Sequence, residues 1–360
     1  MEFALEPLDG LDGLERRWRR AASRAPAVAF LGWTWISAWM AATGLRPVLL
    51  RGRDGGGAEA LGLLCRARLA SGRVVLALNE AAEPELAAPW IEHNGLAGLA
   101  PGDPRVEDAA RFLAATRLEG PLAGWHELRL GGVAARWAPA LARAGLAVRL
   151  RSVQQVHAID LAGLRARGGG IDAALRGSAR AALRRSMRLY AARGPLVLEP
   201  AHGPAALDEL VALHQARWRA RGEAGAFAAP VMARFARELL ARGEATGEVE
   251  LLRARCGGRT IAMLLHLVAG DTASSYLSGV ALEEDNRLKP GLVAHALAAS
   301  AHLARGTGRY DLLAGGVRHK AALALPAGAL AWISARPRGV VAALRDGAER
   351  LRARVAGRPG

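Results

Sequence analysis

Two lysines stand out as candidates for chemistry, because only Lys289 and Lys320 among the 49 basic residues are lysine. Lys289 precedes Pro290 and Gly291 at the expected start of a helix, and Arg287 lies two residues earlier. Free amides at a helix start, the positive end of the helix dipole and cationic side chains all attract anions. Gly291 permits close backbone approach, and proline presets the first turn. The segment predicts a diphosphate site, although many helices without a ligand also begin with proline and glycine.

The second lysine closes a run of ten residues that begins at Asp311 and places His319 beside Lys320. Arginine is used at every other basic position, so these two ammonium groups are either required for their compact charge or retained by chance. Cys65 and Cys256 lie far apart and outside any Cys/His cluster, so the sequence predicts neither a disulfide framework nor a metal site. No GxSxG or Cys/His arrangement offers a covalent nucleophile.

The length and composition are those of a globular protein with about two domains. The chain has 360 residues, of which 51% are hydrophobic and 23% charged, and a typical domain has about 150 residues. No apolar run approaches the about 18 residues of a membrane span. The first residues also lack the pattern of a signal peptide. We therefore expect a cytoplasmic protein.

Positive charge is concentrated in the second half of the chain. Residues 1–150 hold 18 basic and 16 acidic residues, a net charge of +2, whereas residues 151–360 hold 31 and 17, a net charge of +14. Such a field favours a polyanionic partner: a nucleotide-containing cofactor, RNA or an anionic membrane surface. The alternative is a codon bias toward arginine.

The two halves show the same coarse order of expected elements. In the first, helices near 14–22 and 31–43 precede three strand-like runs, a helix near 104–116 and further strands. In the second, a helix over 172–192 with a stripe of arginines, two more helices and a three-strand meander precede a helix from Pro290 and the strand RYDLLAG. Both halves therefore predict related α/β units.

The second half resembles a known family. The order LHQARWRARGEAGAF, the meander and NRLKPGLVAHALAASAHLARGTGRYDLLAGGVRHK, with the helix of Arg184, Arg185 and Arg188, resembles GNAT-fold acyltransferases of the cellulose-biosynthesis (CelD/BcsL) type, which have a BioF-like acetyltransferase domain. That family is related to the FemAB aminoacyl transferases, which contain two GNAT-like domains. The first half is similar more loosely, through its tryptophan helix and the IEHNG segment. The resemblance implies tandem GNAT-like domains over 1–165 and 166–335, each a mostly antiparallel mixed sheet flanked by helices, and a basic tail over 336–360.

The resemblance implies acyl transfer from acetyl-CoA, or another acyl-CoA, to an amine on a small molecule or amino sugar, in polysaccharide or envelope biosynthesis. In GNAT folds one strand splays from its neighbour and pairs with the pantetheine arm, and the following loop and helix start hold the pyrophosphate. The loop here reads RLKPGL in place of the usual RxxGxG/A pattern. The matching cofactor-binding positions are Ser278, Gly279, Val280, Arg287, Lys289, Gly291 and Leu292.

Four residues are the implied catalytic candidates. Lys320 matches the lysine that closes the family's DFxxGxxxYK-like motif and stabilises developing negative charge; the alternative is a surface lysine. His319 lies where tyrosine is common in the family. It is either a base or a proton donor to the thiolate, or it replaces the aromatic ring in packing. Asp311 orients the amine or a water, or caps the next turn. Tyr276 lies on the splayed strand.

Other polar residues are less specific. His214 lies on an apolar helix face and is expected to be a hydrogen-bonded core histidine. Glu92 and Asn94 lie in an apolar neighbourhood and either reach the interdomain groove or cap a turn. One face of adjacent strands is expected to line the acceptor cleft, and its residues are His266, Tyr276 and Ser278.

Two rival functions are compatible with the sequence. The basic second half would suit an aminoacyl transferase that uses charged tRNA, and a catalytically degenerate GNAT scaffold is the alternative that is not an enzyme. The tail, with seven arginines and two acids from Arg336 onward, is expected either to pack as a last helix or to bind the inner face of an anionic membrane.

Overall fold

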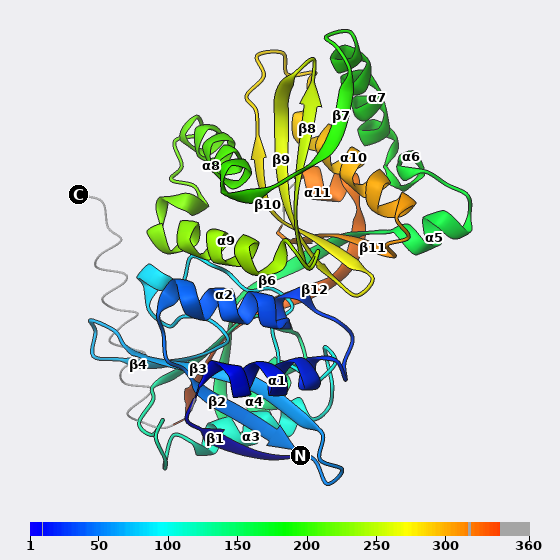
Figure 1. The fold of residues 1–360 in the computed structure, drawn as a ribbon. Coiled ribbons are helices and arrows are strands. Elements are labelled where there is room, and N and C mark those ends of the chain that lie inside the picture. Colours follow the sequence, from blue (N-terminus) through cyan, green and yellow to red (C-terminus); the bar gives the residue numbers. More distant parts are fainter. Residues whose placement is uncertain (9, 316–317, 339–360) are drawn as a thin grey trace, which may run out of the picture.

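The computed structural model describes residues 1–8, 10–315 and 318–338, without the side chains at 318, 319 and 322. Within these residues the strands form one sheet in the order β1-β2-β3-β4-β5-β12-β6-β11-β10-β9-β8-β7. Figure 1 shows two lobes, one from each half of the chain, with β6 and β12 crossing between them. The predicted fold class, two α/β units with mostly antiparallel sheets flanked by helices, is confirmed.

The first half alternates helices and strands. Its elements are β1 (Glu2–Glu6), α1 (Leu11–Ala22), η1 (Ala29–Leu31), α2 (Trp33–Thr43), β2 (Val48–Arg53), β3 (Glu59–Arg68), β4 (Val74–Leu78), η2 (Pro84–Leu86), α3 (Val106–Ala115), β5 (Glu127–Ala134), α4 (Trp137–Arg143) and β6 (Leu146–Asp160).

Three helices connect the halves, and the second half then follows the same order. The connecting helices are α5 (Leu161–Ala166), α6 (Ile171–Ala174) and α7 (Gly177–Ala191). The later elements are β7 (Leu196–Ala201), α8 (Gly203–Arg219), η3 (Ala226–Ala228), α9 (Pro230–Gly243), β8 (Val249–Cys256), β9 (Arg259–Ala269), β10 (Thr272–Val280), α10 (Pro290–Ala304), β11 (Arg309–Ala314), α11 (Arg318–Leu323) and β12 (Leu325–Pro337).

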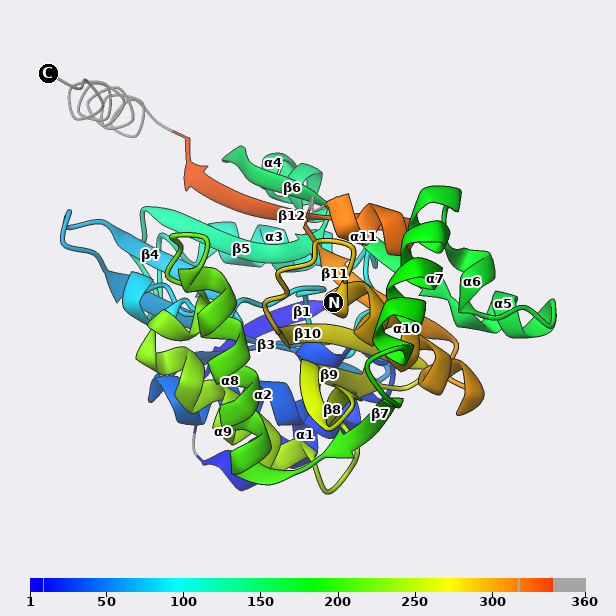
Figure 2. The same cartoon turned by 90° about the horizontal axis from the view of Figure 1, so that it is seen from above.

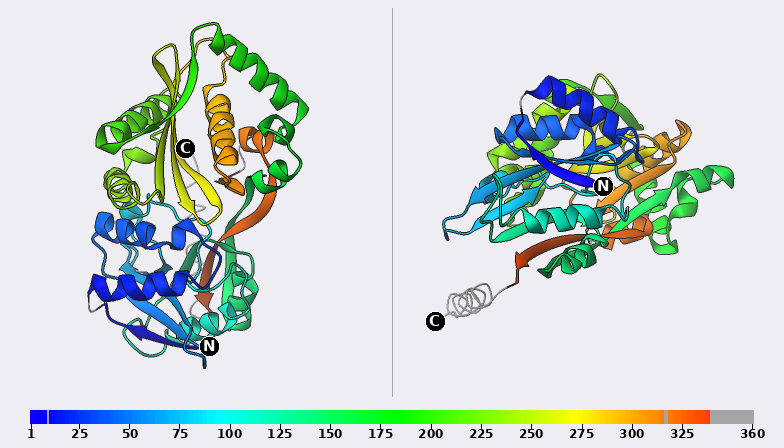
Figure 3. Two further views of the ribbon diagram at one scale, coloured as in Figure 1. Left: turned by 45° about the vertical axis from the view of Figure 1, so that its right-hand side comes forward. Right: turned by 90° about the horizontal axis from the view of Figure 1, so that it is seen from below.

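The halves exchange their last strands. The end of β6 pairs with β11 of the second half, and the end of β12 pairs with β5 of the first half. The two strands also pair with each other along their length. Figure 3 shows β12 running from the second lobe into the first. Each half therefore completes its sheet with a strand from the other.

The two halves also share a hydrophobic core. Helix α2 packs against α9, and the ring of Trp35 lies 4.7 Å from that of Phe235 across this contact. Separate clusters of buried residues lie under α10 in the second half and under α3 and α4 in the first. Figure 2, seen from above, shows the helices on both faces of the curved sheet.

Two expectations about elements are wrong. The helix expected over 172–192 is two helices, α6 and α7, because Leu175 and Arg176 adopt extended backbone between them. This break places Leu175 in the core.

Strand β12 covers a segment for which the sequence predicted no strand. The basic tail beyond residue 338 lies outside the described residues. No helix in the described part of the chain is long and apolar enough to cross a membrane.

Candidate functional site

A gap in strand pairing opens between β10 and β11. These strands pair in parallel only where residues 272–274 meet 309–311. Beyond that point Tyr276 is the extra residue of a bulge in β10, while β11 is irregular between Asp311 and Ala314. Leu313 there has a φ of 64°, which is rare for a residue other than glycine. The strands therefore separate, and the segment from Tyr276 to Val280 pairs only with β9, as expected for a splayed strand.

Helix α10 begins beside this gap. The backbone amide of Lys289, its N-cap residue, donates to the Ser186 hydroxyl of α7 at 2.9 Å. The next two free amides, of Gly291 and Leu292, have no helical partner because they belong to the first turn. No acidic residue lies in that turn. The helix start therefore keeps the positive character that an anion site needs.

The predicted cofactor positions differ in how free they are. The Val280 side chain lies 3.7 Å from where a side chain on Gly291 would begin, so the strand end and the helix start meet. The Ser278 carbonyl already accepts a hydrogen bond from His214 Nδ1 at 2.9 Å. Gly279 is packed against the backbone of α8. Arg287, which is exposed, donates at 2.8 and 3.0 Å to Asp285, so its charge is compensated.

Lys320 reaches back to the end of β11. Its Nζ donates to the Ala314 carbonyl at 2.6 Å and lies 3.4 Å from the Leu313 carbonyl. Burial lowers the pKa of the Lys320 ammonium, and the nearby Glu92 and Asp311 carboxylates partly offset this. The side chain of His319, the other candidate on α11, lies outside the described residues.

Asp311 is a buried, firmly held carboxylate. Its Oδ1 accepts from the Leu313 amide at 2.7 Å, which is the turn-capping contact considered above, and its Oδ2 accepts from Arg309 at 3.1 Å. Burial raises the pKa of Asp311, but the contacts with His93, Arg309 and the Leu313 amide outweigh it and leave the pKa below its ordinary value. Asp311 is therefore ionised at neutral pH.

Glu92 brings the first half of the chain into the site. Its Oε2 accepts from the Ala314 amide at 2.6 Å, across the interface between the halves. Burial raises the pKa of Glu92, while the Ala314 amide, Lys320 and His93 oppose this. Glu92 thus lies buried at the interface between the halves, where it bonds a backbone amide of the other half.

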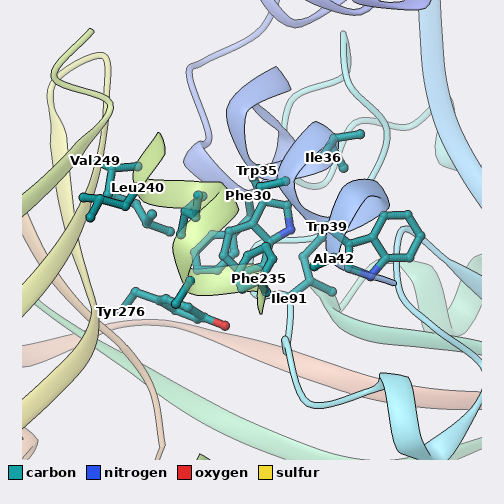
Figure 4. Packing of buried hydrophobic residues seen from close by; sticks show 14 of the residues in the cluster. Phe30, Trp35, Ile36, Trp39, Ala42, Ile91, Phe235, Leu240, Val249 and Tyr276 are labelled. Carbon is teal, nitrogen blue, oxygen red and sulfur yellow. The ribbon is translucent and has the colours of Figure 1, made fainter. Parts of the chain in front are cut away.

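Tyr276 lies among aromatic rings from both halves. Its ring centroid lies 5.0 Å from that of Trp35 and 5.1 Å from that of Trp90. Its hydroxyl lies 3.5 Å from the Trp90 carbonyl and, in Figure 4, points away from Val249. Burial and the Glu92 carboxylate hold the pKa of Tyr276 well above its ordinary value. It is therefore a neutral phenol, able to donate a hydrogen bond.

His93 is a site residue that the sequence reasoning missed. Its Nε2 lies 3.4 Å from Asp311 Oδ2, and its backbone has a φ of 49°. The signal was present, because His93 lies between Glu92 and Asn94 in the IEHNG segment. A histidine between two polar residues in an apolar segment is as good a candidate for the interface as those residues are.

The expectation that His266 shares a face with Tyr276 is wrong. His266 lies on the α10 side of the sheet, where its Nδ1 is 3.0 Å from His302 Nε2. Glu250, His266 and His302 could hold a metal ion, since their ligand atoms lie within 4.8 Å of one another. Arg305, however, donates to Glu250 Oε2 and to His302 Nδ1, both at 2.9 Å. A guanidinium so close to two of the three ligands disfavours a cation there.

The same histidines form a directed chain of hydrogen bonds. Arginine can only donate, so His302 accepts at Nδ1 and donates from Nε2 to His266. His266 Nε2 then donates to the Tyr310 hydroxyl at 3.1 Å, and Tyr310 donates to His295 Nδ1 at 2.9 Å. Burial and Arg305 lower the pKa of His302 to about 4, which keeps the chain neutral. His214 is likewise buried and hydrogen-bonded, as expected for a core histidine.

Comparisons with known proteins place this site in a recognised fold. Residues 177–321 match the family model described as an acetyltransferase (GNAT) domain. No curated protein gives a significant match. A crystal structure of FemX is similar with a TM-score of 0.61 and 9% identity, over 92% of this chain and 97% of that one.

Two further solved structures have similar folds. One is a conserved protein of unknown function from Bacteroides thetaiotaomicron, with a TM-score of 0.55 and 10% identity over 94% of this chain and 100% of that one. The other is the C-terminal DUF2156 domain of an Agrobacterium fabrum protein named as a lysylphosphatidylglycerol synthetase. It has a TM-score of 0.51 and 14% identity, over 93% and 95% of the two chains. At these identities the similarity concerns the fold.

Proposed function

We propose that this protein, an acyltransferase with a GNAT acetyltransferase domain over residues 177–321, moves an acyl group from acyl-CoA to the nitrogen of an amine. The observation that carries the proposal is the gap between β10 and β11. It lies between the positive start of α10 at one end and the buried groups of Asp311, Lys320 and Glu92 at the other. A diphosphate and a thioester would need this arrangement in this order.

The donor's phosphates would bind at the start of α10. The amides of Gly291 and Leu292, the exposed ammonium of Lys289 and the helix dipole all favour an anion. The pantetheine arm would follow the unpaired edge of β10 toward Tyr276. Because His214 occupies the Ser278 carbonyl, the arm would use the remaining backbone groups of that strand.

Two side chains would act on the reacting atoms. Lys320 would stabilise the negative charge that develops on the thioester oxygen, since its ammonium is already positioned by two carbonyls at the end of β11. Tyr276 would donate a hydrogen bond to the departing thiolate, because its raised pKa keeps the phenol neutral. Glu92 would contact the amine, while Asp311, whose two oxygens are already bonded, would act through its neighbours.

An acyl donor on tRNA is the second candidate. The fold similarity to FemX extends over both halves of the chain, and the second half carries most of the positive charge. Under either donor, the polysaccharide pathway, the CelD/BcsL assignment, the domain limits at 165 and 335 and membrane contact through the tail remain predictions from sequence. A tail deletion that leaves liposome flotation unchanged would remove the membrane contact.

The donor can be tested by titration. We expect acetyl-CoA to bind the full chain in calorimetry with an affinity that falls less steeply with salt than RNA binding does, and bulk tRNA to bind weakly. Tight tRNA binding with a steep salt dependence, and none for acetyl-CoA, would favour the second candidate.

A screen would then test transfer. Acetyl-CoA is incubated with glucosamine, ethanolamine and free amino acids, and products are followed by release of free thiol and by mass spectrometry. Transfer to at least one amine is expected. Absence of transfer to every amine, despite acetyl-CoA binding, would contradict the proposed reaction.

A further inference from the structure

We infer that His93 is the general base that takes the proton from the acceptor amine, and that Asp311 positions it. The two residues come from different halves of the chain and meet at the interface, 3.4 Å apart between Nε2 and Oδ2. The inference rests on the proposed function, because it adds the proton acceptor that amine acylation requires. It holds for a thioester or a tRNA ester as donor.

The carboxylate of the pair is fixed before any ligand binds. The Asp311 side chain is 3% exposed, and it is held by the Leu313 amide on one oxygen and by Arg309 on the other. An ionised carboxylate in this position favours the tautomer of His93 that carries its hydrogen on Nε2. The lone pair of the ring is then on Nδ1, which is the atom that can accept a proton.

The other ring nitrogen is available to a ligand. Nε2 of His93 is buried and makes no hydrogen bond within the described part of the chain, and Asp311 Oδ2 lies 3.4 Å from it. Nδ1 has no hydrogen-bond partner among the described residues and is not among the buried unpartnered atoms. The His93 side chain is 23% exposed. The ring therefore presents one nitrogen to the carboxylate and the other to the outside, as a general base must.

The backbone around the pair supports a functional role. His93 and Leu313 both have positive φ, at 49° and 64°, although neither is glycine. His93 carries the imidazole, and the Leu313 amide holds the Asp311 carboxylate. The backbone conformation is thus unfavourable on both sides of the contact between His93 and Asp311. Such strained conformations cluster at functional sites.

The step balances as follows. The acceptor enters as an ammonium ion, and His93 Nδ1 takes one proton from it to give the neutral amine. The amine nitrogen then forms a bond to the acyl carbon, and the bond from that carbon to sulfur breaks. The second proton lost by nitrogen passes to the thiolate, which leaves as a thiol, and His93 returns its proton to solvent. Asp311 stays ionised throughout and stabilises the imidazolium.

Two substitutions of His93 suit its backbone. Asparagine tolerates positive φ better than most residues and provides no base, and glycine adopts positive φ freely and leaves space for added imidazole. His202 is a matched control, because it also lies near a carboxylate, with Nδ1 3.2 Å from Glu244 Oε1, but is largely exposed and away from the gap.

The test compares two acceptors with acetyl-CoA as donor: the best amine of the screen, assayed below neutral pH where it is mostly protonated, and hydroxylamine, which is mostly neutral. We expect His93→Asn to lose about a hundredfold or more in turnover with the amine, to change little with hydroxylamine and to keep its acetyl-CoA affinity. Imidazole should restore His93→Gly, and Asp311→Asn should lose activity without restoration. His202→Asn should behave as the wild type.

Each other result has a distinct meaning. Equal loss with both nucleophiles, together with a lower melting temperature and no effect of imidazole, would assign His93 a structural role and overturn the inference. Unchanged turnover of His93→Asn would overturn it as well, and would leave the proposed function intact. A wild-type protein that acylates none of the amines would overturn the proposed function, and the inference with it.

Discussion

The two halves of the molecule share a topology but differ in what lies between their parallel strands. Strands β1 to β5 and helices α1 to α4 follow the same order as β7 to β11 and α8 to α11. In each half the fourth strand of a meander pairs in parallel with the next strand over three residues only, 75–77 with 127–129 and 272–274 with 309–311. The same splayed geometry therefore arises twice.

In the first half the protein itself fills the splay, meaning the space where β4 and β5 separate beyond their three paired residues. Asn94 Nδ2 donates to the carbonyls of Leu78 on β4 and Gly131 on β5, at 2.9 and 3.0 Å. The chain before it passes so close to Gly132, where φ is 62°, that any side chain there would meet the Ile91 carbonyl. A pantetheine arm would find both strand edges already occupied.

The helix that follows the splay also differs. In the first half α3 has Glu107 and Asp108 in its first turn, and Asp108 accepts from the N-terminal amine of Met1 at 2.8 Å. In the second half α10 has no acid there and has Lys289 as its N-cap residue. One helix start therefore repels phosphate, and the other attracts it.

The comparison teaches that one short segment separates the roles of the halves. Within residues 91–95, Asn94 closes the splay of the first half, while Glu92 and His93 reach Ala314 and Asp311 in the second. The first half would thus leave no room for a donor between its strands, yet it contributes residues to the candidate site of the other half.

The largest effect is expected at the closed splay. Asn94→Ala should lower the free energy of unfolding by about 2–4 kcal/mol, because two buried backbone carbonyls lose the Asn94 amide and the Asn79 amide loses one of its two acceptors. Urea denaturation measures this, with the exposed Asn286→Ala as control. A change below about 0.5 kcal/mol, the size typical of exposed sites, would show that Asn94 does not hold the strands together.

The second expected effect is on turnover. Lys320→Ala should lower turnover more than tenfold, equivalent to more than about 1.4 kcal/mol, with little change in acetyl-CoA affinity. The control is Arg143→Ala in α4, the counterpart of α11 in the first half, which should leave turnover unchanged. Equal effects of the two substitutions would contradict the functional difference between the halves.

Much of the fold could be predicted from the sequence, because amphipathic periodicity and turn residues mark its elements locally. The helices at Pro230 and Pro290 begin at those residues, as predicted. The strand exchange could not be predicted, because Leu146–Asp160 and Leu325–Pro337 pair with segments far away in the chain. Local patterns carry no information on such partners.

The candidate site could be predicted only in its local parts. Lys289 and Gly291 lie together at one helix start, and Asp311 and Lys320 lie nine residues apart, so local sequence marks each pair. The approach of Glu92 to Ala314 spans 222 residues and depends on how the halves pack. A single sequence gives no measure of that packing, so Glu92 remained ambiguous and His93 was missed.

The third prediction concerns the open helix start. Gly291→Asp should weaken acetyl-CoA binding about tenfold, because a carboxylate would lie where the donor's phosphates are expected. Gly177→Asp is a matched control, since Gly177 is exposed, begins α7 and has open space around it. Calorimetry should give the control the wild-type affinity. Equal affinities for both variants would remove the phosphate site from α10 and with it the contrast with α3.

The smallest effect is a pH dependence of stability from Glu80, which follows β4 at the closed splay. Burial raises the pKa of Glu80 to about 7, although the Gly131 amide, Arg151 and Arg129 oppose this. The folded state therefore holds this proton more tightly than the unfolded state. The stabilisation is complete below the ordinary glutamate pKa of 4.5 and is lost as the pH rises through about 7.

Glu80→Gln should remove this loss. Urea denaturation of both proteins at acidic and mildly alkaline pH isolates Glu80, because every other titratable group is common to the two proteins. The difference in unfolding free energy between wild type and variant should shift in favour of the variant as the pH rises, whereas the exposed Glu85→Gln should show no such shift. Parallel pH profiles would mean that the carboxylate beside Gly131 is as well accommodated when charged as when neutral. Glu80 in the first half and Asp311 in the second would then both be accommodated as charged carboxylates. The protonation of these acids would no longer distinguish the two halves.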